Sequence, residues 1–301
     1  MNFNIFKYIF FLTVLFTFSS CSDFFETTIE VDPPEHNEQL VVHGFGSART
    51  DILQVRVSKT TGILDDVNDY DLQVNNASIT LIHNGISYPL MYQDITVNSN
   101  WTYNYILENG SIDFIIGEQY RLEVEADGFE KVTGICTVPE KVLPDNFEFN
   151  LNGPSTFDDD FAEVSMQLSD PSGRSDYYEF YLALQDQDLP LLFLDLYTES
   201  FDPVVEEAGF SLLLNDESFD GELKQLDLLV NRFSLNGQNP EDRLFVYWRT
   251  ISEDHYRYSK SFEQHQEADG NPFASPVQVF SNMENGIGIF SIYNDQYLKV
   301  N

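Results

Sequence analysis

The chain has 301 residues, of which 15 are basic and 50 are acidic, so its formal net charge at pH 7 is −35. Such a charge repels phosphate backbones and anionic headgroups, which argues against a nucleic-acid-binding protein. Hydrophobic residues form 42% of the chain and aromatic residues 15%, a content that excludes a largely disordered protein and predicts folded cores. The simplest role of the acidity is to keep the protein soluble.

The first twenty residues have the pattern of a removable leader. Lys7 precedes an apolar run over 8–18, which ends in two serines and Cys21. The run is too short to span a bilayer, which takes about 20 apolar residues, and it stops at small residues as signal peptides do. The cysteine at this point resembles the lipid attachment site of a bacterial lipoprotein. We expect a signal peptide at 1–20, a lipid on Cys21 and a tether at 21–38; an ordinary secretory signal is the alternative.

Acidic residues follow this cysteine, at Asp23 and Glu26. Acidic residues here resemble the surface-export signal of lipoproteins of the phylum Bacteroidota. We therefore expect an outer-membrane protein that is lipid-anchored and faces the cell surface, and a periplasm-facing anchor is the alternative. Once Cys21 is acylated, Cys136 has no partner for an intrachain disulfide. Cys136 lies in a strand-like run and is expected to pack as a small apolar residue.

Alternating apolar and polar residues predict antiparallel strands in the first half of the chain. The alternation is clear over 51–58, 77–81 and 120–126, and Asn84-Gly85 is a strong hairpin-turn signal. Short strands at this spacing predict an immunoglobulin-like antiparallel β-sandwich over 39–140.

Two loops of this half invite a functional interpretation. The acidic stretch 65–71 superficially resembles a calcium loop, but it lacks the glycine at the sixth position and the glutamate at the twelfth, so we expect a solvated loop. Trp101 lies in a polar loop, where it can either anchor a partner or fold back over the edge of the sandwich.

After a linker around Pro144, the residues 145–301 predict a second antiparallel β domain, either a sandwich or a barrel. The candidate strands are 177–185, 190–197, 226–230, 244–250, 276–280 and 287–293. The run 244–250 carries apolar or aromatic residues on both faces, which predicts a central strand. Glycines on both sides of Ile287 permit a bulge or a close approach of two backbones.

One helix is predicted over 253–267. Ser252 can cap its N-terminus, and the two acidic residues that follow suit the positive end of the helix dipole. Tyr258 and Phe262 are four residues apart and therefore share one face of the helix. The fold class is accordingly mainly β, with two antiparallel β domains and one short helix.

No catalytic or phosphate-binding motif is present. The chain contains no Gly-x-Ser-x-Gly, His-Glu-x-x-His or Cys-x-x-Cys sequence and no phosphate-cradling glycine loop, and its five histidines show no metal-ligand spacing. We therefore expect no enzyme, no cofactor and no metal site. A hydrolase that uses carboxylates of the second domain is kept as an alternative, because a carboxylate pair leaves no spacing signature.

A set of short motifs runs through the chain and resembles a known family. The motifs are Leu40-Val-Val-His-Gly44, Val55 and Val57-Ser58, Asn76-Ala77, Val138-Pro139, Phe219-Asp-Gly221, His255-Tyr256, Tyr258-Ser-Lys260, Asn271-Pro-Phe273, Pro276-Val277, Ser281-Asn282 and Asn285-Gly-Ile-Gly-Ile-Phe290. Together they resemble Bacteroidota lipoproteins of the domain of unknown function 4249, over nearly the whole chain after the leader. The resemblance implies an outer-membrane lipoprotein, often encoded beside a TonB-dependent transporter, and implies no catalytic residues.

From these observations we expect a lipid-anchored binding protein of the cell envelope that assists a TonB-dependent transporter in the uptake of a small molecule or glycan. A structural or adhesive surface module that binds glycan or protein is a second hypothesis, and the hydrolase is a third. A partner surface is expected at Trp101, Tyr256, Asn282 and Asn285.

Overall fold

The computed structural model describes most of the chain from residue 36 onward. The described ranges are 36–62, 65, 68, 71–93, 103–153, 160–186, 189, 191–235, 243–269 and 273–300. Every strand and helix given below lies in one compact unit, formed by Asn37–Thr61 and Asp66–Asn301. The predicted signal peptide, Cys21 and Trp101 lie outside the described residues.

The largest sheet has ten strands. They are β1 Leu40–Ser47, β2 Ile52–Lys59, β5 Met91–Tyr92, β6 Tyr105–Leu107, β11 Tyr177–Gln185, β12 Phe193–Leu196, β14 Val205–Ala208, β15 Ser211–Asn215, β17 Leu244–Ile251 and β19 Ile287–Lys299. Their order is β14-β15-β11-β17-β19-β1-β2-β6-β5, and β12 pairs with β11 beside this path.

Two smaller sheets accompany it. The five-stranded sheet has the order β18-β8-β7-β3-β4, and the four-stranded sheet has the order β13-β16-β10-β9. Their strands are β3 Ser78–His83, β4 Ile86–Pro89, β7 Gln119–Glu125, β8 Val132–Thr137, β9 Asp145–Asn150, β10 Phe161–Ser169, β13 Thr198–Glu199, β16 Leu223–Asn231 and β18 Met283–Glu284. The described helices are α2 Glu253–Ala268 and the 3-10 turn η2 Arg232–Leu235. Among the described strands each sheet runs from one edge to another, so the barrel alternative for the second half is not realised and the sandwich-like layout is confirmed.

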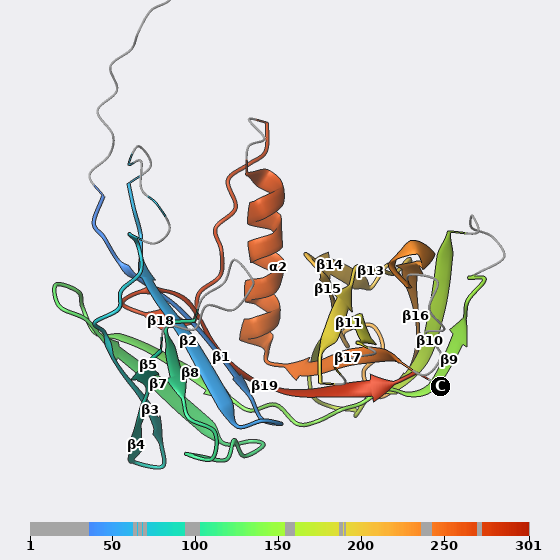
Figure 1. The fold of residues 1–301 in the computed structure, drawn as a ribbon, viewed down its shortest axis with the longest axis horizontal. Coiled ribbons are helices and arrows are strands. Elements are labelled where there is room, and N and C mark those ends of the chain that lie inside the picture. Colours follow the sequence, from blue (N-terminus) through green and yellow to red (C-terminus); the bar gives the residue numbers. More distant parts are fainter. Residues whose placement is uncertain are drawn as a thin grey trace, which may run out of the picture. The chain divides into compact units, whose positions relative to one another are not determined.

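The long strand β19 belongs to both halves of the large sheet. Its first seven residues pair in parallel with β1, from Ile287 opposite Val41 to Tyr293 opposite Ser47. The residues that follow pair antiparallel with β17. Figure 1 shows β19, in red, running from the blue strands of the N-terminal half to the strands of the C-terminal half.

The first core lies between the five-stranded sheet and the β1, β2 and β6 side of the large sheet. Leu53, Val55 and Val57 are fully buried there, which confirms the alternation predicted for 51–58. Phe290 and Ile292 of β19 belong to the same core although they come from the end of the chain. The domain boundary at 140–145 stays a prediction. Strand β19 contributes residues to both cores.

The second core lies between the four-stranded sheet and the β11 and β17 side of the large sheet. Its largest buried side chain is Trp248 of β17, whose indole Nε1 donates to the carbonyl of Val142 at 2.9 Å. Strand β17 lies between β11 and β19, so the central strand predicted at 244–250 is confirmed. Successive residues of a strand point to opposite faces, and the face of β11 and β17 that is turned away from this core is covered in part by α2.

The helix forms as predicted. Ser252 is its N-cap, and its side chain accepts a hydrogen bond from the backbone N–H of His255 at 3.3 Å, which satisfies one of the free donors of the first turn. The helix ends at Ala268, one residue beyond the predicted end. In the described part of the chain, no helix combines the length and apolar character needed to cross a membrane.

The prediction of a strand at 276–280 is wrong. This segment carries no strand, and its backbone groups bond to side chains of α2 instead: Phe280 N–H donates to Ser261 Oγ at 2.8 Å, and His265 Nδ1 lies 3.0 Å from the carbonyl of Val277. The alternating apolar pattern of this segment reflects its packing along α2. Polar side chains of α2 supply the hydrogen-bond partners that a neighbouring strand would supply in a β-ladder.

Gly288 confirms the predicted close approach of two backbones. Its φ is +120°, and a Cβ at this position would lie 2.0 Å from the carbonyl oxygen of Val42 on β1. A glycine is therefore required where β19 begins its parallel pairing.

Candidate ligand pocket

A buried ion pair lies on the sheet face that α2 covers. Glu179 of β11 and Arg249 of β17 are directly opposite each other in the antiparallel register, and Arg249 Nη1 donates to Glu179 Oε2 at 2.8 Å. The side chains retain only 9% and 22% of their exposure. A charge in this environment is stable only when it is paired. Removal of either partner would therefore leave the other as a costly buried charge.

Arg249 lies between two tyrosine rings. Its guanidinium carbon is 4.7 Å from the ring centre of Tyr247 and 4.7 Å from that of Tyr293. Burial alone would lower the pKa of Arg249, but the Glu179 carboxylate raises it well above the ordinary value. Arg249 is therefore a fixed positive charge, and the neighbouring Glu179 carboxylate neutralises it.

Glu179 stays ionised in spite of its burial. Desolvation would raise its pKa, but Arg249, His255 and a hydrogen bond from Ser211 Oγ at 2.8 Å hold the pKa at about 2. His255 Nε2 lies 3.5 Å from the same carboxylate. Burial nevertheless lowers the pKa of His255 to about 4, and Arg249 adds to this effect, so the imidazole is neutral at pH 7.

A pocket of about 640 Å³ opens between α2 and this sheet face. We call it the α2 pocket. It is lined by Phe45 of β1, Tyr103 just before β6, Glu179 of β11, Asp195 of β12, Arg249 of β17, Tyr293 of β19 and His255, Tyr258, Ser259 and Phe262 of α2. Five of these residues are aromatic, and a few converging polar groups accompany them. This size and composition are those of small-molecule sites.

Asp195 is the accessible charge of the α2 pocket. Partial desolvation raises the pKa of Asp195, whereas a hydrogen bond from Tyr181 on the neighbouring strand and the charge of Arg249 act to lower it. The residue is exposed, and no ion pair joins it to another described residue.

Ser291, His255 and Glu179 form a line that resembles a catalytic triad. His255 Nδ1 lies 3.0 Å from Ser291 Oγ, and its other nitrogen faces Glu179. However, Ser291 is fully buried within β19 and does not line the α2 pocket. A nucleophile must reach the reacting carbon of a substrate, so this line of residues is a structural hydrogen-bond network.

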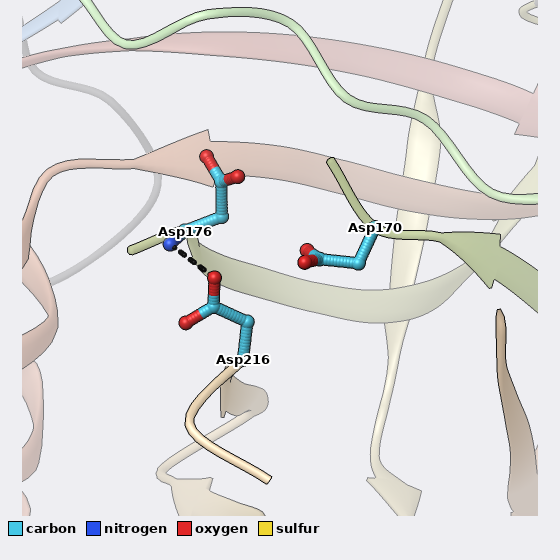
Figure 2. A group of neighbouring side chains, drawn as sticks. All are labelled: Asp170, Asp176 and Asp216. Carbon is cyan, nitrogen blue, oxygen red and sulfur yellow. Dashed lines mark hydrogen bonds between the residues drawn. The ribbon is translucent and has the colours of Figure 1, made fainter. Parts of the chain in front are cut away.

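A second polar cluster brings together Asp170, Asp176 and Asp216, all buried. One potential ligand atom from each lies within 4.8 Å of the others. Figure 2 shows Asp216 bonded to the backbone N–H of Asp176 at 2.8 Å, with the Asp176 side chain turned away from it.

The carboxylates of this cluster already have protein donors. Asp170 accepts from the hydroxyl of Tyr178 at 2.7 Å and from the N–H of Gly221 at 3.1 Å, and Asp176 accepts from Arg174 Nε at 2.7 Å. Three carboxylates are hard oxygen ligands of the kind that Ca²⁺ prefers, although that ion takes six to eight. In the geometry described, the cluster fixes the loops beside β10, β11 and β15.

The predicted partner residues that are described do not line the α2 pocket. Tyr256 is 6% exposed, and its hydroxyl accepts from Asn215 Nδ2 at 2.9 Å. Asn282 bonds through its Oδ1 and Nδ2 to the N–H and carbonyl of Phe290, each at 2.9 Å. Asn285 lies in an exposed turn with φ +61°. These contacts give Tyr256 and Asn282 structural roles, and the partner surface itself stays a prediction.

Sequence reasoning missed the α2 pocket, although one signal was available. Glu179 and Arg249 are single charges inside strands whose other residues are nearly all apolar or aromatic. Charged residues are rarely buried unless paired, so two opposite charges in such strands predict a contact between them. The contributions of Phe45 and Tyr103 depend on long-range pairing and leave no local pattern.

The features above define a mainly β protein of sandwich type with an aromatic pocket beneath its α-helix. The chain belongs to the family described as Domain of unknown function (DUF4249), whose model matches residues 26–298. A search of curated proteins finds no match to the chain.

Proposed function

We propose that the protein is a lipid-anchored binding protein of the cell envelope that takes a small ligand into the α2 pocket and assists a TonB-dependent outer-membrane transporter. The observation that carries the binding role is the α2 pocket itself, about 640 Å³ in volume and lined by five aromatic residues and a fixed ion pair. Fixed polar groups among rigid aromatic rings orient a ligand with little loss of side-chain freedom on binding.

The location and the transporter partner rest on the sequence. The apolar leader, the cysteine at position 21 and the acidic residues after it support attachment through lipid and display at the surface. Two or more acyl chains hold a folded domain stably at a membrane, so the tether would keep the α2 pocket close to a transporter.

The binding role is tested by a thermal-shift screen of the full chain against sugars, amino acids, amines and carboxylates. The same screen is run on Ser259→Trp, which places a large ring into the α2 pocket, with circular dichroism to verify folding. A ligand that stabilises the wild type and not Ser259→Trp supports the proposal. Ligands that act equally on both proteins, or none at all, contradict it.

The membrane part of the proposal is tested separately. The wild type should fractionate with the outer membrane and co-purify with a transporter in mild detergent, and Cys21→Ser should be found in the soluble fraction. Repeated recovery of the wild-type protein without a transporter would contradict the partnership.

A second candidate function, a surface module that docks on another protein, is favoured by one observation. Between residues 189 and 210, seven large apolar side chains are exposed: Leu189, Leu191, Leu192, Leu194, Tyr197, Phe201 and Phe210. Exposed apolar groups that gather in one stretch of chain mark interaction surfaces more often than isolated ones do. In that case Leu191→Glu should abolish partner binding, whereas Ser259→Trp should not.

A further inference from the structure

We propose that the α2 pocket selects an organic cation, an amine or quaternary ammonium group, which it holds between aromatic rings and the carboxylate of Asp195. This inference rests on the proposed binding function and names the chemical class of its ligand.

The charges that line the α2 pocket leave one negative charge without a counter-ion. Glu179 and Arg249 neutralise each other through their 2.8 Å contact. His255 is neutral at pH 7, because burial lowers its pKa to about 4. Asp195 remains, an exposed carboxylate that accepts a hydrogen bond from Tyr181 and is attracted more weakly by Arg249, whose charge Glu179 already neutralises. A cationic ligand would complete this charge balance.

The aromatic lining suits the same ligand. The face of an aromatic ring carries partial negative charge and attracts a cation within about 6 Å of its centre. The protein already uses this interaction inside the pocket, because Arg249 lies 4.7 Å from the ring centre of Tyr293. Phe45, Tyr103, Tyr258 and Phe262 supply further rings around the cavity. Several rings around a cation form the arrangement by which proteins recognise quaternary ammonium groups.

The charge of the whole chain acts in the same direction. A net charge of −35 raises the local concentration of cations and lowers that of anions, and a cleft with low-dielectric walls focuses the field. An anionic ligand would have to approach Arg249 beside the carboxylates of Glu179 and Asp195, whose negative charges repel it. The α2 pocket therefore disfavours carboxylates and phosphates.

The test uses three probes that share one ring and differ in charge: benzyltrimethylammonium, benzyl alcohol and phenylacetate. Isothermal titration calorimetry on the full chain should give the order cation, neutral probe, anion, with at least a tenfold difference between the first and the last. Asp195→Asn should weaken binding of the cation about tenfold, which corresponds to about 1.4 kcal/mol. Asp145→Asn, which removes an equal charge from exposed strand β9, should change it less than about twofold.

The outcomes separate this inference from the proposed function. Binding of benzyl alcohol or phenylacetate that is as tight as that of the cation, and is lost in Ser259→Trp, overturns the cationic class and leaves the ligand pocket in place. No binding of benzyltrimethylammonium at millimolar concentration also overturns the cationic class. Binding that Ser259→Trp does not affect, for every probe and every compound of the screen, contradicts the pocket itself.

Discussion

Glu179 and Arg249 face each other across two adjacent strands, with a hydrogen bond of 2.8 Å between Oε2 and Nη1. The pair lines the α2 pocket, and the other residues of the two strands are nearly all apolar or aromatic. Its position means that the fold must bring the two charges together before either can be buried.

Removal of one partner should therefore destabilise the protein strongly. We expect Glu179→Gln and Arg249→Met each to lower the free energy of unfolding by about 3–5 kcal/mol. Each change leaves the other member of the pair as a buried charge without a counter-charge. The double variant should lose less than the sum of the two. Urea unfolding of the four proteins measures this coupling, and strict additivity would contradict the pairing.

Stability should fall on acidification through His255. Burial lowers the folded-state pKa of His255 from 6.5 to about 4, so the unfolded chain binds this proton at a higher pH than the folded chain. The contribution is present in full above pH 6.5, is lost as the pH falls and is gone below about pH 4. It amounts to a few kcal/mol, on the order of 3.

The variant His255→Asn removes this titration. Its free energy of unfolding should fall less than that of the wild type between about pH 7 and about pH 4.5, as measured by urea unfolding. His43, whose pKa burial also lowers to about 4, should retain its own part of the slope in this variant. Equal slopes for wild type and His255→Asn would refute the assignment.

Gly288→Ala should be among the most damaging single changes. A Cβ at this position would lie 2.0 Å from the carbonyl oxygen of Val42, and φ is +120°. Gly128→Ala is the matched control, because its φ is +88° and a Cβ there meets nothing within 4 Å. The control should cost about 1–2 kcal/mol from the backbone alone, and Gly288→Ala clearly more. Equal losses of thermal stability would mean that the contact with β1 is unimportant.

The aspartate cluster gives a test of hydrogen bonding against charge. Asp216 accepts from the N–H of Asp176, and burial raises the pKa of both carboxyl groups. Asp216→Asn retains an acceptor and removes a charge, so its stability should equal or exceed that of the wild type. Asp216→Ala leaves the N–H unsatisfied and should cost about 1–3 kcal/mol. A large loss in Asp216→Asn, reversed by added Ca²⁺, would reveal a charge requirement that protein hydrogen bonds do not explain.

Local patterns were sufficient for the elements that are half-buried. The strands around Leu53 and Leu122 bury one face, so their sequences alternate, and the turn at Asn84 adopts the positive φ that its hairpin requires. The helix after Ser252 carries its own cap and acidic first turn. In each case the signal lies within ten residues, and the surrounding structure agrees with it.

Other features had no local signal. The parallel pairing of Ile287–Tyr293 with β1 depends on strands that are far apart in the sequence. The segment predicted as a strand at 276–280 alternates in the same way as a true strand, but α2 satisfies its backbone. The α2 pocket combines Phe45, Tyr103 and Arg249 only after the sheet has formed. Periodicity reports which side of an element is buried and does not report what buries it.

The pairing of β19 with β1 also determines when the first core can be completed as the chain is synthesised. Val41 and Ile287 are partners, so β1 waits for β19, which is synthesised much later. A ribosome makes a polypeptide from its N-terminus, so the first core still lacks Phe290 and Ile292 until β19 has been made. Such late closure slows folding, because distant segments must meet before either is stabilised. The first core is therefore among the last parts of the described fold to be completed.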